Sequence, residues 1–597
     1  MDDQKNMIAA AVLSLLVIVG WTYFFAPEPP PPSEITQTTQ TGEEAPVGGV
    51  VAPSTTAGSG SVSESEDTTV EAARIRIETP AMTGSISLKG GRIDDTHLVN
   101  YKDTLEPGAD TVVQLSPIGT LHPYFAVYGW LAEGGAKTPA PNTIWSLETG
   151  DKLTPDTPIT LVWDNGAGLT FRREIAVDDK YMFTITQSVV NATGETVSLS
   201  PYGYVARRGL PELENFFILH EGAVAAYNGE SEYLDYDDLE DLETVRGSTR
   251  SKTVTATDGG YVGFTDKYWM TTLAAAPHQP FTAVYKYSLR NNGPEYRTEA
   301  LFPAQDVAPG ATAQTQTYLF SGAKEFAVIA DYQEKLQIVR FEESIDWGWF
   351  YFLTKPIFKL LLWVKGFIGN MGWSIIVLTL IIKAVLFPLA YKSYVSMSKM
   401  KKLQPEMEKL KERHGDDRQA MQKDMMALYK REKANPAAGC LPILLQIPIF
   451  FSLYKVLFVT IEMRHAPFML WIEDLSAPDP TSFMNLFGLL PWDAPDPASF
   501  IGILSIGVFP ILMGVTMWMQ QKLNPAPTDK MQAQIFAWMP WVFMFMLGSF
   551  ASGLVIYWCA NNILTFTQQY AIMRSQGVDV DFLGNVKKTF KRKPKEG

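Results

Sequence analysis

Apolar runs of membrane-spanning length constrain this chain more than any other feature. Residues 7–26 form a run of 20 residues without a charge, which is long enough to cross about 30 Å of hydrocarbon. Five further candidate spans lie in the second half of the chain, at 373–391, 437–459, 500–520, 533–548 and 553–573. The sequence therefore predicts a polytopic α-helical membrane bundle with six transmembrane helices.

The N-terminal run has two interpretations. A cleaved signal peptide needs a basic segment before its apolar run, but here Asp2 and Asp3 stand beside a single Lys5. We therefore expect residues 1–26 to be an uncleaved transmembrane anchor. Residues 27–70 are rich in Pro, Ser, Thr, Gly and Glu, a composition that cannot bury a core, so we expect a disordered linker there.

The basic residues of the loops predict the orientation of the spans. The loop 392–433 has 12 Lys and Arg against 7 acidic residues, and the tail 574–597 has 7 against 3. The loop 460–499 has one against 6. Since loops rich in Lys and Arg stay in the cytoplasm, six spans put both termini in the cytoplasm and residues 27–350 outside.

Residues 71–343 predict a large all-β domain, most simply a sandwich. Two alternating runs, 169–171 and 182–186, flank Asp178-Asp179 in a hairpin pattern, and helical spacing follows at 323–341. Residues 344–369 predict an interfacial amphipathic helix, because Lys355 and Lys359 form a polar stripe among Trp, Phe and Leu.

Several classes of chemistry are not supported. The sequence has no P-loop and no HExxH motif. Its 2 Cys exclude a disulfide-built scaffold, and its net charge of −14 argues against a chain-wide nucleic-acid surface. Acidic residues crowd 230–243, where a solvated loop is favoured over a calcium site because the spacing matches no calcium loop. We expect no cofactor, no metal and no enzymatic activity.

Lys383 is the prominent charge within the candidate spans. It lies ten residues into the run 373–391, where a lone ammonium costs about 2.5–3.5 kcal/mol on insertion scales. Thr379 lies four residues earlier on the same face, and Gln446, Asn561 and Asn562 add polarity from other spans. These residues predict a hydrophilic pocket. The alternative is that Lys383 extends to the interface while the other polar groups join helices.

Two further features of the second half have alternatives. Lys455 is nearer the end of its span, where extension to the interface is the favoured interpretation. The loop 392–433 predicts a cytoplasmic helical hairpin with apolar stripes that include Met407 and Leu410 on one helix and Met425 on the other. Its methionines could receive apolar partners, or the two helices could simply pack on each other.

Several motifs resemble the signature of the YidC/Oxa/Alb family of membrane protein insertases. They are Asn435-Pro436 with Gly439-Cys440, Gln446 with Pro448, Gly553-Leu554 with Tyr557-Trp558 and Asn561, and the hairpin residues Met407, Met425, Met426 and Tyr429. The match is close over 345–573, whereas residues 1–343 match by arrangement the family members that have a large periplasmic domain. Two positions depart from the family pattern, because Lys383 replaces the usual Arg and Ala551 replaces a frequent Pro.

The resemblance implies an insertase and chaperone of the bacterial inner membrane that acts on nascent membrane proteins without nucleotide hydrolysis. It implies a five-helix core within 370–573, a periplasmic β-super-sandwich, and a substrate groove that would also include Phe387, Tyr557 and Trp558. The Sec translocon, the ribosome and the signal recognition particle receptor would be partners. The tail 574–597 would contact the ribosome or anionic lipids through its basic residues Lys587, Lys588, Lys591, Arg592 and Lys593.

Three other functions remain open from the sequence. A solute transporter predicts internal repeats and broken helices, and no repeat is visible, although Pro442 and Pro448 could break one helix. A structural assembly scaffold would bury Lys383 without using it. Sugar binding by the outer domain is the third alternative.

Overall fold

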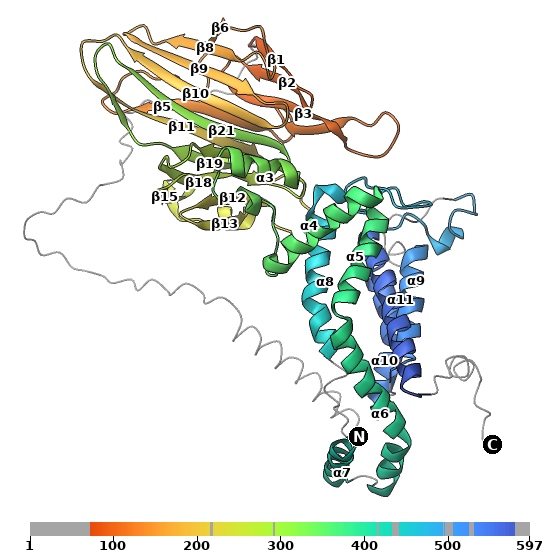
Figure 1. Cartoon of the computed structure of the whole chain (residues 1–597). Coiled ribbons are helices and arrows are strands. Elements are labelled where there is room, and N and C mark those ends of the chain that lie inside the picture. Colours follow the sequence, from red (N-terminus) through yellow and green to blue (C-terminus); the bar gives the residue numbers. More distant parts are fainter. Residues whose placement is uncertain are drawn as a thin grey trace, which may run out of the picture. The chain divides into compact units, whose positions relative to one another are not determined.

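The computed structural model describes residues 72–578 except 215–218, 247, 291–292, 415–416, 433–440, 493–494, 496–504 and 525–529. The predicted anchor 1–26, the linker 27–70 and the basic residues 587–593 of the tail therefore lie outside the described residues. So do Asn435-Pro436 and Gly439-Cys440 of the family signature. The described chain consists of an all-β domain followed by helices (Figure 1).

The larger sheet of the all-β domain contains 12 of the described strands. Its neighbours are antiparallel except β1 and β7, which are parallel. The path β14-β15-β18-β19-β11-β5-β3-β2-β1-β7 has β20 beside β11 and β4 beside β3. The bounds are β14 (Thr244–Arg246), β15 (Thr249–Ala256), β18 (Phe281–Arg290), β19 (Gly293–Leu301), β11 (Val197–Arg208), β5 (Tyr124–Ala132), β3 (Arg92–Lys102), β2 (Met82–Ser87), β1 (Arg74–Glu78), β7 (Lys152–Leu153), β20 (Gln305–Val307) and β4 (Thr111–Leu115).

The second sheet contains 9 of the described strands and includes the predicted hairpin. Here β9 (Leu169–Val177) pairs with β10 (Met182–Asn191) around Asp178-Asp179, and alternate residues of β9 are buried. The sequence prediction of this hairpin is confirmed. The remaining strands, in sheet order, are β13 (Glu230–Asp235), β12 (Gly222–Tyr227), β16 (Gly260–Thr265), β17 (Trp269–Ala275) and β21 (Thr312–Ala323), with β8 (Ile159–Asp164) and β6 (Ser146–Thr149) beyond β9.

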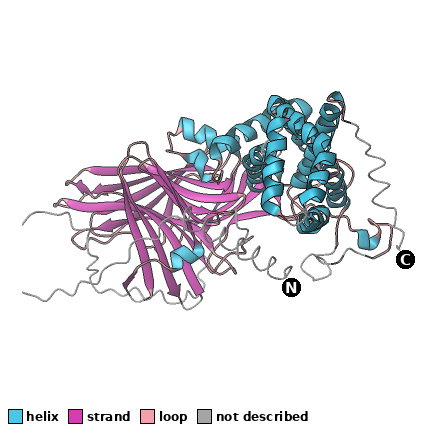
Figure 2. Ribbon diagram, turned by 90° about the horizontal axis from the view of Figure 1, so that it is seen from below, coloured by secondary structure: helices cyan, strands magenta, loops and turns pink. Residues whose placement is uncertain are grey.

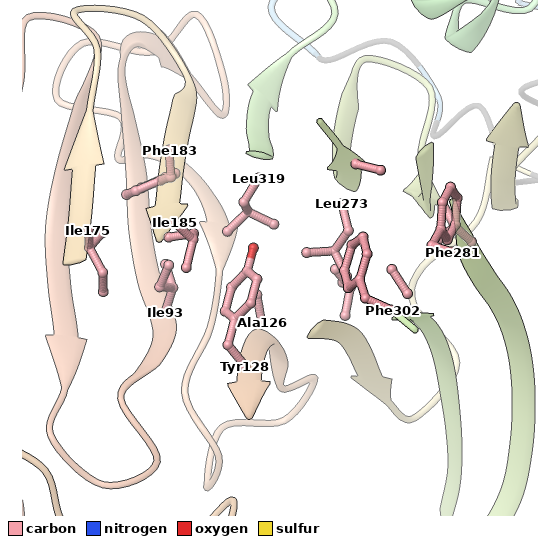
Figure 3. Packing of buried hydrophobic residues seen from close by; sticks show 14 of the residues in the cluster. Ile93, Ala126, Tyr128, Ile175, Phe183, Ile185, Leu273, Phe281, Phe302 and Leu319 are labelled. Atoms are coloured by element: carbon pink, nitrogen blue, oxygen red, sulfur yellow. The ribbon is translucent and has the colours of Figure 1, made fainter. Parts of the chain in front are cut away.

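The inner faces of the two sheets form one apolar core, so the predicted sandwich is confirmed. Figure 3 shows Phe183 and Ile185 of one sheet packed near Ile93 and Tyr128 of the other. These side chains are buried, and burying each apolar side chain stabilises the fold by about 1.5–3 kcal/mol.

A buried arginine ties the two sheets together. Arg173 on β9 is only 1% exposed, and its guanidinium donates to the carbonyls of Gly90 and Gly91 at 3.0 Å and of Tyr128 at 2.5 Å. It also lies over the ring of Trp145, 4.6 Å from the centroid. Burial lowers the pKa of Arg173 to about 10, so the residue stays charged at neutral pH.

The acidic segment 230–243 is largely exposed, as we expected, but it is not a loop. It forms β13 and the short helix α2 (Tyr236–Glu240), and several of its carboxylates bind neighbouring side chains. Glu232 pairs with Lys252 and accepts a hydrogen bond from Tyr285 at 2.8 Å, and Glu240 accepts one from Tyr296 at 2.5 Å. The described residues contain no cluster of three or more ligating side chains that could hold a metal ion.

The helices follow the sandwich and gather into one bundle (Figure 2). Within the bundle, α11 packs against α9 and α5, while α4 packs against α8 and α5. The described helices are α3 (Phe326–Lys335), η1 (Phe341–Ser344), α4 (Tyr351–Ile368), α5 (Met371–Val385), α6 (Phe387–His414), α7 (Arg418–Arg431), α8 (Leu441–Val459), η3 (Ile461–Met463), η4 (Phe483–Asn485), α9 (Val508–Gln521), α10 (Lys530–Met546) and α11 (Ser552–Ser575).

The expectation of one continuous span at 373–391 is wrong. The chain bends by 68° between α5 and α6, at Leu386. Pro388 gives the physical reason, since it has no N–H to donate to the carbonyl of Ala384 four residues earlier and its ring crowds that carbonyl. Among the described residues, only this bent pair has the length and apolar composition to cross a membrane, and no single helix does.

The polar stripe of α4 lies at the edge of its exposed face, with Lys355 half-buried and Lys359 exposed. The Nζ of Lys355 lies 3.7 Å from Glu342 and Glu343, and Lys359 lies 5.3 Å from the centroid of the Phe326 ring. Trp363, one turn after Lys359, is exposed as well, so large aromatic side chains share this face with the lysines.

Candidate functional site

Lys383, Gln446 and Tyr557 meet inside the helical bundle, although they come from three different helices. The Nζ of Lys383, near the end of α5, donates to the Oε1 of Gln446 on α8 at 3.3 Å. The Nε2 of Gln446 donates in turn to the hydroxyl of Tyr557 on α11 at 2.6 Å. We call these three side chains the polar triad. The tyrosine holds the amide so that its carbonyl oxygen faces the ammonium.

The polar triad lies in apolar surroundings. Leu378 and Tyr557 are buried, and Ile382 and Leu386 pack beside them. In the part of the chain that the structure describes, Lys383 forms a hydrogen bond with Gln446 and no ion pair with a carboxylate. Charged residues in such places are ordinarily paired or face water. The arrangement therefore offers a positive charge, partly open to its surroundings, to an acidic ligand.

The other predicted groove residues are only partly gathered around the triad. Thr379 is buried, but its hydroxyl donates to the carbonyl of Ile375 at 2.7 Å. Asn561 lies one turn after Tyr557, and its Oδ1 is buried without a hydrogen-bond partner in the described structure. Asn562 is on another face, because its amide donates to Thr516 of α9 at 3.3 Å.

Two aromatic residues predicted for the groove lie apart from the hydrogen bonds of the triad. Phe387 begins α6 just after the bend and is exposed, with its ring 6.2 Å from that of Tyr391. Trp558 packs against Phe450, with ring centroids 4.8 Å apart. Both remain predicted groove residues.

Lys455 forms an ion pair with a carboxylate of the segment before α4. Its Nζ lies 2.5 Å from the Oδ2 of Asp346, and its side chain is 9% exposed. Asp346 belongs to the segment between η1 and α4, so this ion pair connects that segment to α8. The sequence analysis did not identify Asp346. Asp346 directly precedes Trp347 and lies three residues before Trp349. An acidic residue among aromatic residues, just before an apolar helix, was the available sign that it has a partner.

The helical hairpin is formed by α6 and α7, as predicted. Leu403 and Leu428 are buried between the helices, and Met407, Leu410 and Tyr429 pack against them. This supports packing of the two helices on each other. Met425 is half-buried, while Met426 points outward and is exposed. Gly415 and Asp416 of the turn lie outside the described residues.

The last helix has a well-defined start although Ala551 stands where the family often has Pro. The helix α11 begins at Ser552 with Ala551 as its N-cap residue. The Ser552 N–H donates to the carbonyl of Ala477 and the Gly553 N–H to that of Leu475, at 2.7 Å and 2.9 Å. Neighbouring chain therefore satisfies the first N–H groups of the helix.

The described chain is therefore a β-sandwich protein with a C-terminal helical bundle, in which the half-buried Lys383 has no carboxylate partner among the described residues. Comparison with known proteins identifies the family. The family model described as 60Kd inner membrane protein matches residues 363–578, and the one described as YidC periplasmic domain matches residues 74–360.

Curated relatives agree along the whole chain. The chain is 56% identical over 627 aligned residues to the membrane protein insertase YidC of Jannaschia sp. (strain CCS1), covering 100% of both chains. It is 56% identical over 603 residues to that of Dinoroseobacter shibae, covering 99% of each. A crystal structure of an active YidC insertase matches with a TM-score of 0.35 and 17% identity, covering 84% of this chain and 93% of that one. The chain belongs to the YidC family of membrane protein insertases, a non-enzymatic family, and the family resemblance of its sequence is confirmed.

Proposed function

We propose that this chain inserts nascent proteins into the bacterial inner membrane and helps them fold. Membership of the insertase family supports this function. The observation that carries the mechanism is the polar triad, in which Lys383 has an amide rather than a carboxylate as its hydrogen-bond partner. The charge is therefore available to a substrate.

The polar triad reduces the barrier for a short hydrophilic segment. A polar segment that enters hydrocarbon loses its hydrogen bonds to water, and the triad replaces some of them. Lys383 attracts acidic residues of that segment. Two opposite charges 4 Å apart attract by about 1 kcal/mol in water and about 4 kcal/mol at an effective dielectric constant of 20. Lysine gives a point charge rather than the bidentate fork of arginine, so the geometry of the acid is weakly constrained.

The substrate helix leaves sideways into lipid. The proposed path continues along Tyr557, Asn561, Phe387 and Trp558. Thr379 and Asn562 support the helices beside it, since their side chains bond to Ile375 and Thr516. Burial of the apolar substrate in hydrocarbon supplies the driving force, at about 25 cal/mol for each Å² removed from water. The membrane potential adds work on charged segments, about 2.3 kcal/mol per charge per 100 mV.

The proposed topology has six spans, with both termini in the cytoplasm and the sandwich in the periplasm. Residues 1–26 anchor the chain, 27–70 link the anchor to the sandwich 71–343, and 370–573 form the core. The exposed aromatic side chains of α4, such as Trp363, support an interfacial position for residues 344–369. Among partners we propose the Sec translocon, the ribosome and the signal recognition particle receptor through the hairpin 392–433, and anionic lipids or ribosomal RNA for the tail 574–597.

The test uses purified full-length protein in liposomes without nucleotide or Sec components. The substrate is a small membrane protein whose translocated segment carries acids, and its insertion is measured by protease protection. Wild type should insert it, Lys383→Ala should insert it less, and Lys383→Glu least. The control is Lys335→Ala, an exposed lysine on α3 that pairs with Asp331, which should equal wild type.

Each other outcome has a definite meaning. Equal insertion by all variants would remove the role of Lys383 and leave the insertase function in place. No insertion by the wild type would favour an assembly scaffold or a factor that needs the Sec translocon.

A further inference from the structure

Residues 482–492, which we call the apolar loop, form an ordered segment between α8 and α9 that exposes large apolar side chains. The loop has no charged residue. Leu486, Phe487, Leu489 and Trp492 are all exposed, from 42% for Phe487 to 85% for Leu489. A contiguous exposed group of this kind indicates a surface that contacts something apolar.

Several backbone groups of the apolar loop are hydrogen-bonded within the loop. The N–H groups of Phe487, Leu489 and Leu490 donate within the loop, to the carbonyls of Ser482, Leu486 and Asn485 at 2.7, 3.3 and 3.0 Å. The indole of Trp492 donates to the carbonyl of Met484 at 3.2 Å. Irregular chain is excluded from hydrocarbon because its unpaired N–H and C=O groups lose their hydrogen bonds to water. The hydrogen bonds within the loop lower the free-energy cost of moving it into lipid.

The polar side chains of the loop are also used internally. The Oδ1 of Asn485 accepts from the N–H of Gly488 at 3.0 Å, and its Nδ2 donates to the carbonyl of Trp492 at 3.4 Å. The Oγ of Ser482 accepts from Met484 at 3.1 Å and from Ser505 at 2.6 Å. The exposed face of the loop is therefore almost purely apolar, with few groups to recognise a polar protein surface.

The shape of the loop is held under backbone strain. Leu486 and Phe487 have φ of 50° and 58°, and Gly488 follows with φ of 90°. Left-handed conformations are costly for Leu and Phe and persist where the surrounding bonds enforce them. The strained turn directs the apolar side chains outward rather than toward the bundle.

Hydrogen bonds fix the apolar loop at the N-terminal end of α9. The Phe483 N–H donates to the carbonyl of Ile506 at 3.0 Å. Thr481 Oγ1 and Asp479 Oδ2 accept from the first N–H groups of α9, those of Val508 and Phe509, at 3.0 and 2.9 Å. The loop therefore lies at the level where this bundle helix begins.

We propose that the apolar loop inserts into the lipid leaflet at this end of α9. The occupant of its exposed face is lipid, because the face has no charge, several of its backbone N–H groups are bonded within the loop, and Trp and Phe are typical of the membrane interface. The identity of the leaflet as the outer one rests on the topology proposed above. Lipid contact itself does not depend on that topology or on the insertase mechanism.

The test places an environment-sensitive fluorophore on the loop of the full chain. In a variant with Cys440→Ala and Cys559→Ala, a single cysteine is introduced by Leu489→Cys, or by Trp492→Cys as a second position, and labelled with nitrobenzoxadiazole. The matched control is Glu473→Cys, an exposed acidic position in the same inter-helix segment. Each protein is reconstituted at a low protein-to-lipid ratio, with or without spin-labelled phospholipid.

The proposal predicts blue-shifted emission and quenching by spin-labelled lipid at 489 and 492, with a water-like spectrum at 473. A water-like spectrum at 489 and 492 would overturn it. A blue shift that appears only when other membrane proteins are added, or that disappears on dilution in lipid without lipid quenching, would also overturn it, in favour of a protein partner or a second copy. Insertion activity measured in parallel separates this result from a failure of the insertase mechanism.

Discussion

Removing the carboxylate of Asp346 should destabilise the helical bundle by about 3 kcal/mol. The Nζ of Lys455 lies 2.5 Å from this carboxylate, with side-chain exposures of 9% for the lysine and 25% for the aspartate. Breaking a buried pair by removing one partner costs about 3–5 kcal/mol, because a charge is left buried without compensation. Water reaches the aspartate here, so we expect Asp346→Asn to fall at the lower end of that range.

A double-mutant cycle tests this explanation. Replacing the lysine as well, in the variant Asp346→Asn with Lys455→Met, removes the buried charge, and the double variant should recover most of the lost stability. Thermal unfolding in detergent, followed by circular dichroism, measures each melting temperature. A double variant as unstable as the sum of the two single variants would refute the reasoning, since the charge would then not be the source of the loss.

Three further predictions concern stability of the full chain, all measured by thermal unfolding. Burial raises the pKa of Glu462 to about 7, so the folded state keeps a proton that the unfolded state loses near pH 4.3, and stability falls as pH rises between these values. Glu462→Gln removes this pH dependence. The free energy of unfolding of the variant should exceed that of wild type by up to about 3 kcal/mol at pH 8 and by little at pH 4. An equal difference at both pH values would contradict this explanation. Arg173→Met removes the donor of hydrogen bonds to three carbonyls and should lower the free energy of unfolding by at least about 3 kcal/mol. An unchanged stability would show that Arg173 does not hold the two sheets together. A Cβ on Gly372 would lie 2.2 Å from the ring of Phe468, so Gly372→Ala should cost about 1–3 kcal/mol. Gly366→Ala on α4, which meets nothing within 4 Å, should instead be neutral or stabilising by up to about 1 kcal/mol.

The sandwich was predictable from the sequence because its signals are local. The alternation of β9 and the acidic turn before β10 lie within about twenty residues, and both strands follow that pattern. For Arg173, by contrast, the alternation of β9 predicts only on which face of the sheet the side chain lies, and not what it contacts. Its partners Gly90 and Tyr128 are more than forty residues away in the chain, and no local pattern connects them.

The candidate site likewise combines residues that the sequence identifies with contacts that it could not predict. Lys383 was identifiable because a charge within an apolar run is rare, but its contacts with Gln446 and Tyr557 depend on how three helices pack. The bend at Leu386 had a local signal in Pro388, which outweighs the apolar run that predicts one span. The contact of Lys455 with Asp346 spans 109 residues of sequence and could not be derived from either neighbourhood.

The most direct test of the account is a charge exchange between Lys383 and the substrate. In proteoliposomes, Lys383→Glu is compared with wild type on two substrates that differ only in the translocated segment, which carries either acids or lysines. The account predicts that wild type prefers the acidic segment and that Lys383→Glu reverses the preference, since each attraction of about 1–4 kcal/mol becomes a repulsion. The same preference in both proteins would contradict a direct electrostatic contact between Lys383 and the substrate.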